Sequence, residues 1–283
     1  MGNVNKQLND HRYCVYALLT LGNGDLVSAG DDKTILIWNT NNGTVKQTLI
    51  GHTLSIRDLK VKSNFLISAS LDKTIKIWNF ADGALSKTLA GHAGPVMHLA
   101  LLQDGDLASA SFDKTIKLWD INEGTVKRTL TGHTDAVWAL VVLNNGDLVS
   151  GSMDRTIRIW DVEAGTIKRK LTEHTAGVLR LIVLENGDLV SGSYDETIKI
   201  WNTEDGTVKQ TLTGQTQHVN ALKELDNGDL VSGSSDSTMK IWDVKDGSLK
   251  KSITVNSVIY SLELLENGDL VTGCANGTIK IWE

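Results

Sequence analysis

Serine, histidine and aspartate recur together in this chain, in an order and spacing that could support nucleophilic catalysis. In such a triad the histidine takes a proton from the serine, and the aspartate orients the histidine. Four complete sets are present: His52, Ser70 and Asp72; His92, Ser111 and Asp113; His133, Ser152 and Asp154; and His174, Ser193 and Asp195. An enzyme needs its triad once, with an oxyanion hole beside it. Four copies at matching spacing therefore predict a role that every repeated unit shares.

Tryptophan marks the period of these units. The chain of 283 residues has 8 Trp beside only 3 Phe. Seven of the tryptophans are separated by 40 or 41 residues: Trp38, Trp78, Trp119, Trp160, Trp201, Trp242 and Trp282. The surrounding phrase, which begins Gly-Asp-Leu-Val-Ser-Gly-Ser and ends at the Trp, is nearly complete at 146–161, 187–202 and 228–243. A fixed period of this length indicates repeated supersecondary units that stack on one another.

The unit at 132–172 predicts four short antiparallel strands and no helix. Strand-like runs occur at 137–143, 148–152, 156–160 and 166–171. The turn between the first two runs contains Asn145 and Gly146, a pair that is common in hairpins. A lone four-stranded sheet cannot bury both of its faces, so the units must pack against one another.

The two ends of the chain predict that the stack closes into a ring of seven blades. The last unit stops at Glu283, directly after its third strand, and residues 2–8 align with the fourth strand at 43–49. We therefore expect residues 2–8 to supply the outer strand of the blade formed by about 255–283. A linear stack would need polar capping repeats, and neither end has the pattern of one.

Three Gly-His pairs complete a family resemblance. Gly51-His52, Gly91-His92 and Gly132-His133 are each followed after about 20 residues by Ser-x-Asp and then by Trp-Asp or Trp-Asn. In these motifs the chain resembles the WD-repeat β-propellers over essentially its whole length. The resemblance implies an all-β fold, namely a single seven-bladed β-propeller domain of four-stranded antiparallel blades over 1–283. The chain departs from the family in using Asn-Gly-Asp where Pro-Asp-Gly is common.

The resemblance also implies that Asp, His, Ser and the Trp of the third strand form a hydrogen-bonded network. In it the Asp accepts from the His, and the His lies between the Ser and the indole N–H, so that buried polar groups are satisfied. The complete networks expected are the four sets given above, together with Trp78, Trp119, Trp160 and Trp201 respectively. Three blades are expected to be incomplete: Gly30 replaces Ser in the first, Gln215 replaces His in the sixth, and the seventh has Cys274 and Asn276 and no His.

Composition and charge argue against several classes of function. A net charge of −6 opposes binding to nucleic acid or to an anionic membrane surface. His98 and His218 lie outside the repeated Gly-His position and have no second ligand at metal spacing, so no metal and no cofactor are expected. The chain has only two cysteines, Cys14 and Cys274, and no apolar leader, which favours a reducing, cytoplasmic location.

Charged residues are expected to separate by surface. The turns between first and second strands and between third and fourth strands hold nearly half of the 34 acids, so one face of the ring is predicted to be acidic. That face serves either solubility or a basic partner. The outer strands carry Lys and Arg and no acid, a pattern that prevents edge-to-edge pairing and favours a monomer.

The opposite face carries the variable positions. One set comes directly before the Asp of the Ser-x-Asp motif in each unit, and a second set lies early in the first strand. In the family that the chain resembles, such positions line the mouth of the central channel. The predicted partner-binding residues are Tyr16, Arg57, Leu71, Met97, Phe112, Trp138, Met153, Leu179, Tyr194 and Tyr260. Exposed aromatic and Met side chains are typical of protein-binding hot spots. The alternative is that some of them pack between blades.

The sequence therefore predicts a non-catalytic scaffold, not an enzyme, which binds a peptide or protein segment at the channel mouth through blades two to five. Because the face has little clustered Arg, a phosphorylated motif is disfavoured as the ligand. Two alternatives stay open. One is a purely structural or assembly module of a larger protein, and the other is an engineered or recently amplified repeat array without an evolved ligand.

Overall fold

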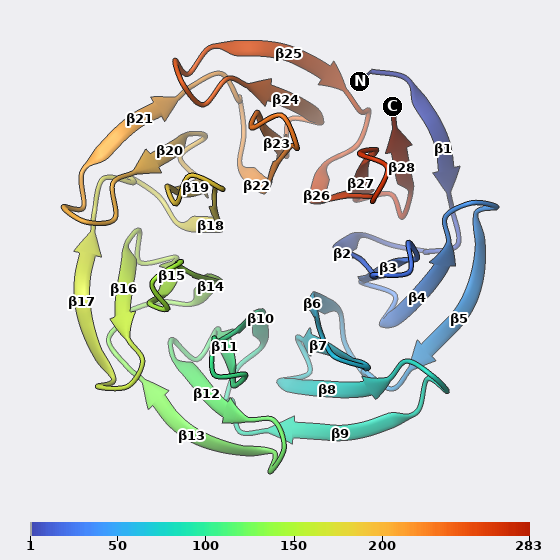
Figure 1. The fold of residues 1–283 in the computed structure, drawn as a ribbon, viewed down its shortest axis with the longest axis horizontal. Helices are drawn as coiled ribbons and strands as arrows, with labels where there is room; N and C mark the ends of the chain where they lie inside the picture. Colours follow the sequence, from blue (N-terminus) through green and yellow to red (C-terminus); the bar gives the residue numbers. More distant parts are fainter. Residues whose placement is uncertain (1) are drawn as a thin grey trace.

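The computed structural model describes residues 2–283 as seven four-stranded antiparallel sheets, or blades, arranged in a ring. In Figure 1 the first strand of each blade faces the centre and the fourth runs along the rim. Residue 1, which belongs to the predicted domain 1–283, lies outside the described residues. From residue 2 onward, the structure contains no helix that is long and apolar enough to cross a membrane. The predicted all-β propeller is confirmed.

The blades are numbered in chain order, and their strands are given from the centre outward. Blades one and two consist of β2 (Val15–Thr20), β3 (Leu26–Gly30), β4 (Thr34–Asn39), β5 (Thr44–Ile50), and β6 (Ile56–Lys62), β7 (Phe65–Ser70), β8 (Thr74–Asn79), β9 (Leu85–Ala90). Blades three and four consist of β10 (Val96–Leu101), β11 (Leu107–Ser111), β12 (Ile116–Asp120), β13 (Thr125–Leu130), and β14 (Val137–Val142), β15 (Leu148–Ser152), β16 (Ile157–Asp161), β17 (Thr166–Leu171). Blades five and six consist of β18 (Val178–Val183), β19 (Leu189–Ser193), β20 (Ile198–Trp201), β21 (Val208–Leu212), and β22 (Val219–Glu224), β23 (Leu230–Ser234), β24 (Thr238–Trp242), β25 (Leu249–Thr254). Blade seven consists of β26 (Ile259–Leu264), β27 (Leu270–Cys274), β28 (Ile279–Trp282) and β1 (Val4–Leu8).

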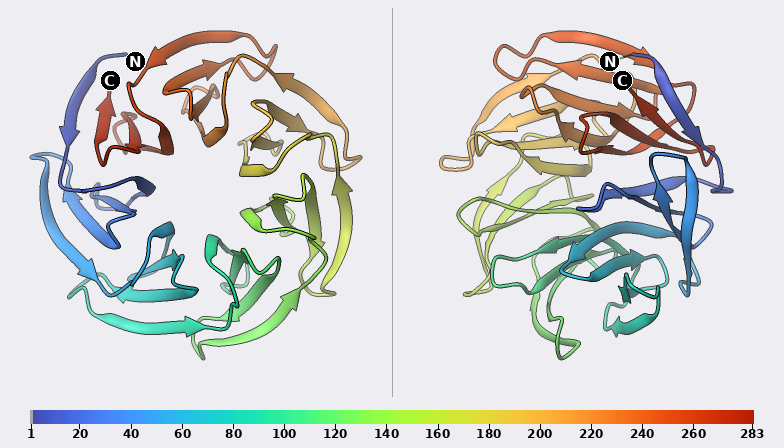
Figure 2. Two further views of the ribbon diagram at one scale, coloured as in Figure 1. Left: turned by 180° about the vertical axis from the view of Figure 1, so that it is seen from behind. Right: turned by 45° about the vertical axis from the view of Figure 1, so that its right-hand side comes forward.

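The ring is closed by β1, which is the outer strand of blade seven. β1 pairs antiparallel with β28, from Val4 opposite Trp282 to Leu8 opposite Ile279. Beyond these pairs, the backbone N–H of Gly2 donates to the carbonyl of Glu283 at 2.8 Å. Figure 2 shows the two chain ends close together at blade seven in both of its views. The N-terminal segment therefore completes the blade that the C-terminal segment begins, as the sequence predicted.

Blade four shows why this sequence forms a meander. Its four strands match the runs predicted for 132–172, and Gly146 in the first turn has φ of 88°, a left-handed conformation that favours glycine. All five residues of β15 are buried, whereas β17 is mostly exposed. The small residues Ser150, Gly151 and Ser152 allow Val178 of blade five to approach β15 closely. The outer strand, packed on one side only, carries the charged residues.

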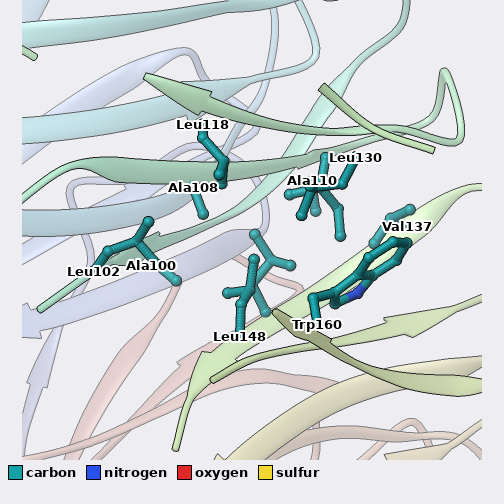
Figure 3. Close-up of a cluster of buried hydrophobic side chains, with 11 residues drawn as sticks. Ala100, Leu102, Ala108, Ala110, Leu118, Leu130, Val137, Leu148 and Trp160 are labelled. Atoms are coloured by element: carbon teal, nitrogen blue, oxygen red, sulfur yellow. The ribbon is translucent and has the colours of Figure 1, made fainter. Parts of the chain in front are cut away.

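The hydrophobic core lies between blades. In Figure 3, Trp160 of blade four is grouped with Val137 and Leu148 of its own blade and with Ala110 and Leu130 of blade three. The Trp160 side chain is 1% exposed. Every one of the seven clusters within residues 2–283 contains one of the periodic tryptophans. The period of Trp is thus the period of the interfaces between blades, where an aromatic side chain buries the largest area.

Candidate functional site

The repeated polar residues form a buried hydrogen-bonded network in each complete blade. In blade two, His52 Nδ1 lies 2.7 Å from the carboxylate of Asp72, and His52 Nε2 lies 2.7 Å from Ser68 Oγ. The indole N–H of Trp78 donates to the same Ser68 Oγ at 2.9 Å. Because the carboxylate accepts from Nδ1–H, Nε2 is an acceptor and the Ser68 hydroxyl donates to it. The four side chains therefore satisfy one another without water.

The Gly-His pair also has a structural reason. Gly51, the residue before His52, lies against the indole ring of Trp78. A Cβ at Gly51 would come within 2.9 Å of the ring carbon Cη2. Because Gly51 has no side chain, the backbone can pass directly over the indole ring of Trp78, and the imidazole of His52 can reach the serine that Trp78 also contacts.

The predicted identity of the bridging serine is wrong by two residues in four blades. The serines that contact His and Trp are Ser68, Ser109, Ser150 and Ser191, where the sequence pattern indicated Ser70, Ser111, Ser152 and Ser193. Ser70 makes different contacts. Its hydroxyl lies 3.1 Å from both the Leu54 carbonyl, to which it donates, and the Asp72 N–H, from which it accepts. It thereby stabilises the turn that carries the aspartate.

Blade one is complete, contrary to the expectation based on Gly30. Ser28 lies 2.6 Å from His11 Nε2 and 2.7 Å from the Trp38 indole nitrogen. The position of Gly30 has no space for a side chain, since a Cβ there would lie 1.9 Å from the Cys14 carbonyl oxygen.

Blades six and seven lack the full network. In blade six the amide of Gln215 donates to Ser232 at 2.7 Å, in the place of the histidine. In blade seven Trp282 donates to Thr272 at 3.1 Å, and no histidine lies beside it. The sequence pattern pointed to Cys274 at that position, and Thr272 takes the role instead.

The network holds its aspartates in the charged form. Burial alone would raise the pKa of Asp32, but hydrogen bonds from His11 and Thr34 outweigh this and lower it to about 2. The same balance lowers the pKa values of the four equivalent aspartates, Asp72, Asp113, Asp154 and Asp195, below the usual range. The bridging serines are 0% exposed and already share their hydroxyls with Trp and His. This arrangement stabilises each blade and offers no hydroxyl to a substrate.

Replacing Ser150 with Ala is therefore expected to destabilise the protein by about 2–4 kcal/mol, because it leaves both His133 Nε2 and the Trp160 indole N–H buried without a partner. The matched change Ser152→Ala removes two partly buried hydrogen bonds to backbone groups of a turn, and its expected cost is smaller, about 1–2 kcal/mol. Urea unfolding of the two variants measures the difference. Equal losses, or a larger loss for Ser152→Ala, would contradict the assignment.

Charges on the predicted acidic face and basic rim meet in ion pairs. Five outer-strand lysines contact an aspartate of the first turn in their own blade: Lys46–Asp25, Lys127–Asp106, Lys168–Asp147, Lys209–Asp188 and Lys250–Asp229. The N–O distances are 2.5–2.7 Å. The acids of these first turns are thus partly neutralised by the rim, which reduces the field that this face presents to a basic partner.

A pocket of about 190 Å³ lies at the channel mouth on the opposite face. Seven of the predicted partner-binding residues line it, together with Arg180 and Asn220: Tyr16, Arg57, Met97, Trp138, Leu179, Tyr194 and Tyr260. Leu71, Phe112 and Met153 are not part of this lining. Phe112 is nevertheless next to it, because its ring meets the edge of Trp138 at 5.6 Å between centroids and is 40% exposed as a residue.

Aromatic rings surround a cation in this pocket. The guanidinium carbon of Arg57 lies 3.7 Å from the centroid of Tyr16 and 5.6 Å from that of Trp138. Tyr16 and Tyr260 are in ring contact at 4.9 Å, and Trp138 and Tyr194 at 6.4 Å. Burial raises the pKa of Tyr16 well above its usual value, so its phenol stays neutral. Met97 and Leu179 are only 4% and 5% exposed, so they form the apolar wall of the pocket and contribute little to the exposed surface of this face.

A bulge in each first strand explains the residue that sequence reasoning missed. In β18 the register shifts between Val178 and Arg180, and in β6 between Ile56 and Asp58. Two consecutive residues can then face the channel instead of alternating. Leu179 and Arg180 accordingly both line the mouth pocket. Strict alternation along the strand would have placed only one of them there.

A second cavity of about 590 Å³ continues along the channel toward the acidic face. Asp58, Lys60, His98 and Arg180 are among its lining residues. Asp58 accepts from the backbone N–H of Leu99 at 2.8 Å and pairs with Lys60 at 2.9 Å. Burial lowers the pKa of His98 to about 3, so this histidine is neutral at physiological pH. In residues 2–283, no His, Cys, Asp and Glu side chains group into a set that could hold a metal.

Comparisons with known proteins agree with this architecture. A family model described as "WD domain, G-beta repeat" matches residues 2–39, 43–79, 83–120, 124–161, 165–202, 206–243 and 247–283. Among solved structures, the chain is similar to the WD40 beta propeller domain of Doa1, with 27% sequence identity and a TM-score of 0.89. That alignment covers 100% of this chain and 97% of the other. None of the curated proteins matches the chain.

Proposed function

Because this chain belongs to the family of WD domains with G-beta repeats, whose propellers generally act as protein-interaction scaffolds, we propose that it is a non-catalytic scaffold for a peptide or protein segment. The segment binds at the mouth pocket, and blades two to five supply most of the contacts. An apolar side chain of the segment packs against Phe112, Trp138 and Tyr194, whose rings meet edge to face. The two free cysteines support a reducing, cytoplasmic location for this interaction.

One observation carries the proposal. The indole nitrogen of Trp138 is the single buried side-chain polar atom without a hydrogen-bond partner in residues 2–283. Leaving a buried donor unpaired costs about 1–3 kcal/mol. The seven framework tryptophans, by contrast, all donate to a serine or threonine hydroxyl. A bound segment that turns the Trp138 ring toward the pocket and offers its N–H an oxygen removes this cost, which favours binding at this ring.

The test is selection of random twelve-residue peptides displayed on phage against the immobilised chain, followed by calorimetry on the selected peptides. The mouth variant combines Phe112→Glu, Trp138→Glu and Tyr194→Glu. A control variant combines Ile50→Glu, Phe65→Glu and Leu85→Glu, which are exposed apolar residues outside the pocket. The mouth variant is expected to lose at least about tenfold in affinity and the control to lose little, provided that both melt cooperatively. Equal affinities for the two variants would place the binding elsewhere.

An assembly module that uses the rim is the second candidate. Exposed apolar side chains recur on the outer strands, at Val4, Leu85, Val126, Ile167 and Leu249. They lie on the fourth strands of blades two, three, four, six and seven, and these strands run along the rim in Figure 1. If the control variant with Leu85→Glu loses binding and the mouth variant does not, this second function is favoured.

A further inference from the structure

The mouth pocket contains two guanidinium groups and no carboxylate. Arg57 comes from β6 in blade two and Arg180 from β18 in blade five, and both line the same space. The other lining residues are Tyr16, Met97, Trp138, Leu179, Tyr194, Asn220 and Tyr260, none of which is acidic. The fold thus brings together two cations that are far apart in the sequence. This corrects the inference from sequence that the face has little clustered Arg.

Arg180 is held rigidly across the channel. Its Nε donates to the carbonyl of Asn220 at 2.7 Å, and its Nη2 lies 3.2 Å from the carbonyl of Tyr260, to which it donates. Within the described residues, Nη1 makes no hydrogen bond. A guanidinium fixed by two backbone carbonyls loses little further freedom when it binds an anion, so it is preorganised for recognition.

Arg57 is held by aromatic rings instead of by an acid. Its guanidinium stacks on Tyr16 and lies near Trp138. Cation–π contacts stabilise a cation only modestly, and they leave its in-plane N–H groups available for an oxygen acceptor. Two acids lie near these arginines. Asp31 is already engaged by the hydroxyl of Ser55. Asp58, the residue after Arg57, lines the second cavity, where it pairs with Lys60 and attracts Arg180. Asp58 offsets part of the repulsion between the two like charges, and an anion bound between the two guanidinium groups offsets it further.

We propose that the mouth pocket binds the carboxylate of a glutamate or aspartate side chain of the partner segment, held between Arg57 and Arg180. The proposal rests on the proposed function and names the chemistry of its anchor. The acid is flanked by an apolar residue that packs on Trp138, and the Trp138 indole N–H is a further donor for the segment. A carboxylate suits the pocket better than a phosphate. Arg180 has already committed two of its nitrogens, and about 190 Å³ accommodates one small acidic side chain.

The experiment uses synthetic peptide libraries blocked by acetyl and amide groups, with random residues on both sides of one fixed central residue. The fixed residue is glutamate, glutamine or phosphoserine, and a fourth library has random residues and a free C-terminal carboxylate. Peptides retained by the immobilised chain are identified by mass spectrometry, and the best are measured by calorimetry. We expect the glutamate library to be retained at least about tenfold better than the glutamine library, as charge-assisted hydrogen bonds exceed neutral ones.

Variants of the two arginines test whether their side chains produce the preference for glutamate. Arg57→Gln and Arg180→Met are each expected to abolish the preference for glutamate over glutamine. Arg57→Lys is expected to retain part of it, since Lys keeps the charge without the planar fork. The control is Arg12→Gln, which removes one exposed positive charge from a loop on the same face and should leave the preference intact. Thermal melting confirms that each variant is folded; where Arg180→Met is not, Arg180→Gln, which removes the charge but keeps a hydrogen-bond donor, replaces it.

Each outcome decides the proposal. Equal retention of glutamate and glutamine peptides, with loss of both in the mouth variant, overturns the carboxylate assignment and leaves the proposed function standing. A stronger preference for phosphoserine, or for the free C-terminal carboxylate, overturns the assignment to an acidic side chain. Retention of no library by the wild-type chain overturns both the assignment and the proposed function.

Discussion

Deletion of residues 2–8 is expected to lower the thermal midpoint by about 10–20 °C or to abolish cooperative unfolding. The deletion removes β1 and leaves the outer edge of β28 unpaired. It also removes Leu8, which is 4% exposed and packs with Trp38 and Ile281. Several ladder hydrogen bonds at about 1 kcal/mol each and a buried Leu at about 2 kcal/mol sum to about 5 kcal/mol or more. A loss of that size is comparable with the whole stability of many proteins.

Circular dichroism melting of the purified chains measures this effect. A control variant, Val4→Ser, keeps the β1 backbone and changes a side chain that is 44% exposed, so its midpoint should move by only a few degrees. Adding a synthetic peptide of residues 2–8 to the truncated chain should restore part of the stability in a concentration-dependent way. An unchanged midpoint in the truncated chain would show that β1 does not hold the ring closed.

Acidification from pH 5 to pH 2 is expected to unfold the protein or to lower its midpoint by more than about 10 °C. The pKa of Asp32 falls from 3.8 to about 2 on folding, and the four equivalent aspartates shift in the same direction. Because the folded pKa lies below the unfolded one, the stabilisation is fully present above about pH 4. It is lost as the pH falls toward and through the folded values.

The size of this loss follows from the number of networks. A shift of about two pKa units corresponds to roughly 2.5 kcal/mol at one site. Half of that at each of five blades already reaches about 6 kcal/mol, which is comparable with the total stability of many proteins. Urea unfolding at pH 5, 4, 3 and 2 measures the slope, and Asp154→Asn should make it shallower. A stability that is constant between pH 4 and pH 2 would contradict the charged state of these aspartates.

The fold could be predicted almost completely from the sequence because each blade repeats the same local signals. Seven tryptophans at nearly constant spacing marked the interfaces between blades, and turns such as the one at Gly146 marked the ends of strands. Ring closure could also be predicted, because residues 2–8 carry the pattern of a fourth strand that the last repeat lacks. Local periodicity and local turn chemistry are both visible in one dimension.

The bridging serine could not be identified in this way. Ser68 and Ser70 are two residues apart in β7, so both side chains point to the same face of the strand. Which of them meets His52 depends on how far the preceding loop carries the imidazole over the sheet, and spacing does not report that distance. The same ambiguity led to the expectation that Gly30 breaks the network of blade one, where Ser28 completes it.

The charge in the mouth pocket could not be predicted for a different reason. The bulge before Arg180 breaks the alternation on which strand predictions depend, and no residue type at 178–180 signals it. Arg57 was predicted at the channel mouth, but only the closed ring shows that blades two and five present their arginines to the same pocket. Contacts across the channel join segments that no local pattern connects.

The pairing of β1 with β28 also determines how the ring responds to mechanical force. The start of β1 lies beside the end of β28, with Val4 opposite Trp282, and the two chain ends leave blade seven at the same edge. Tension applied between the two ends therefore pulls at right angles to the strands and breaks the ladder one rung at a time. A load along the strands would have to break all rungs at once. Blade seven is thus where the ring unzips under tension, while the six blades with continuous chain are still intact.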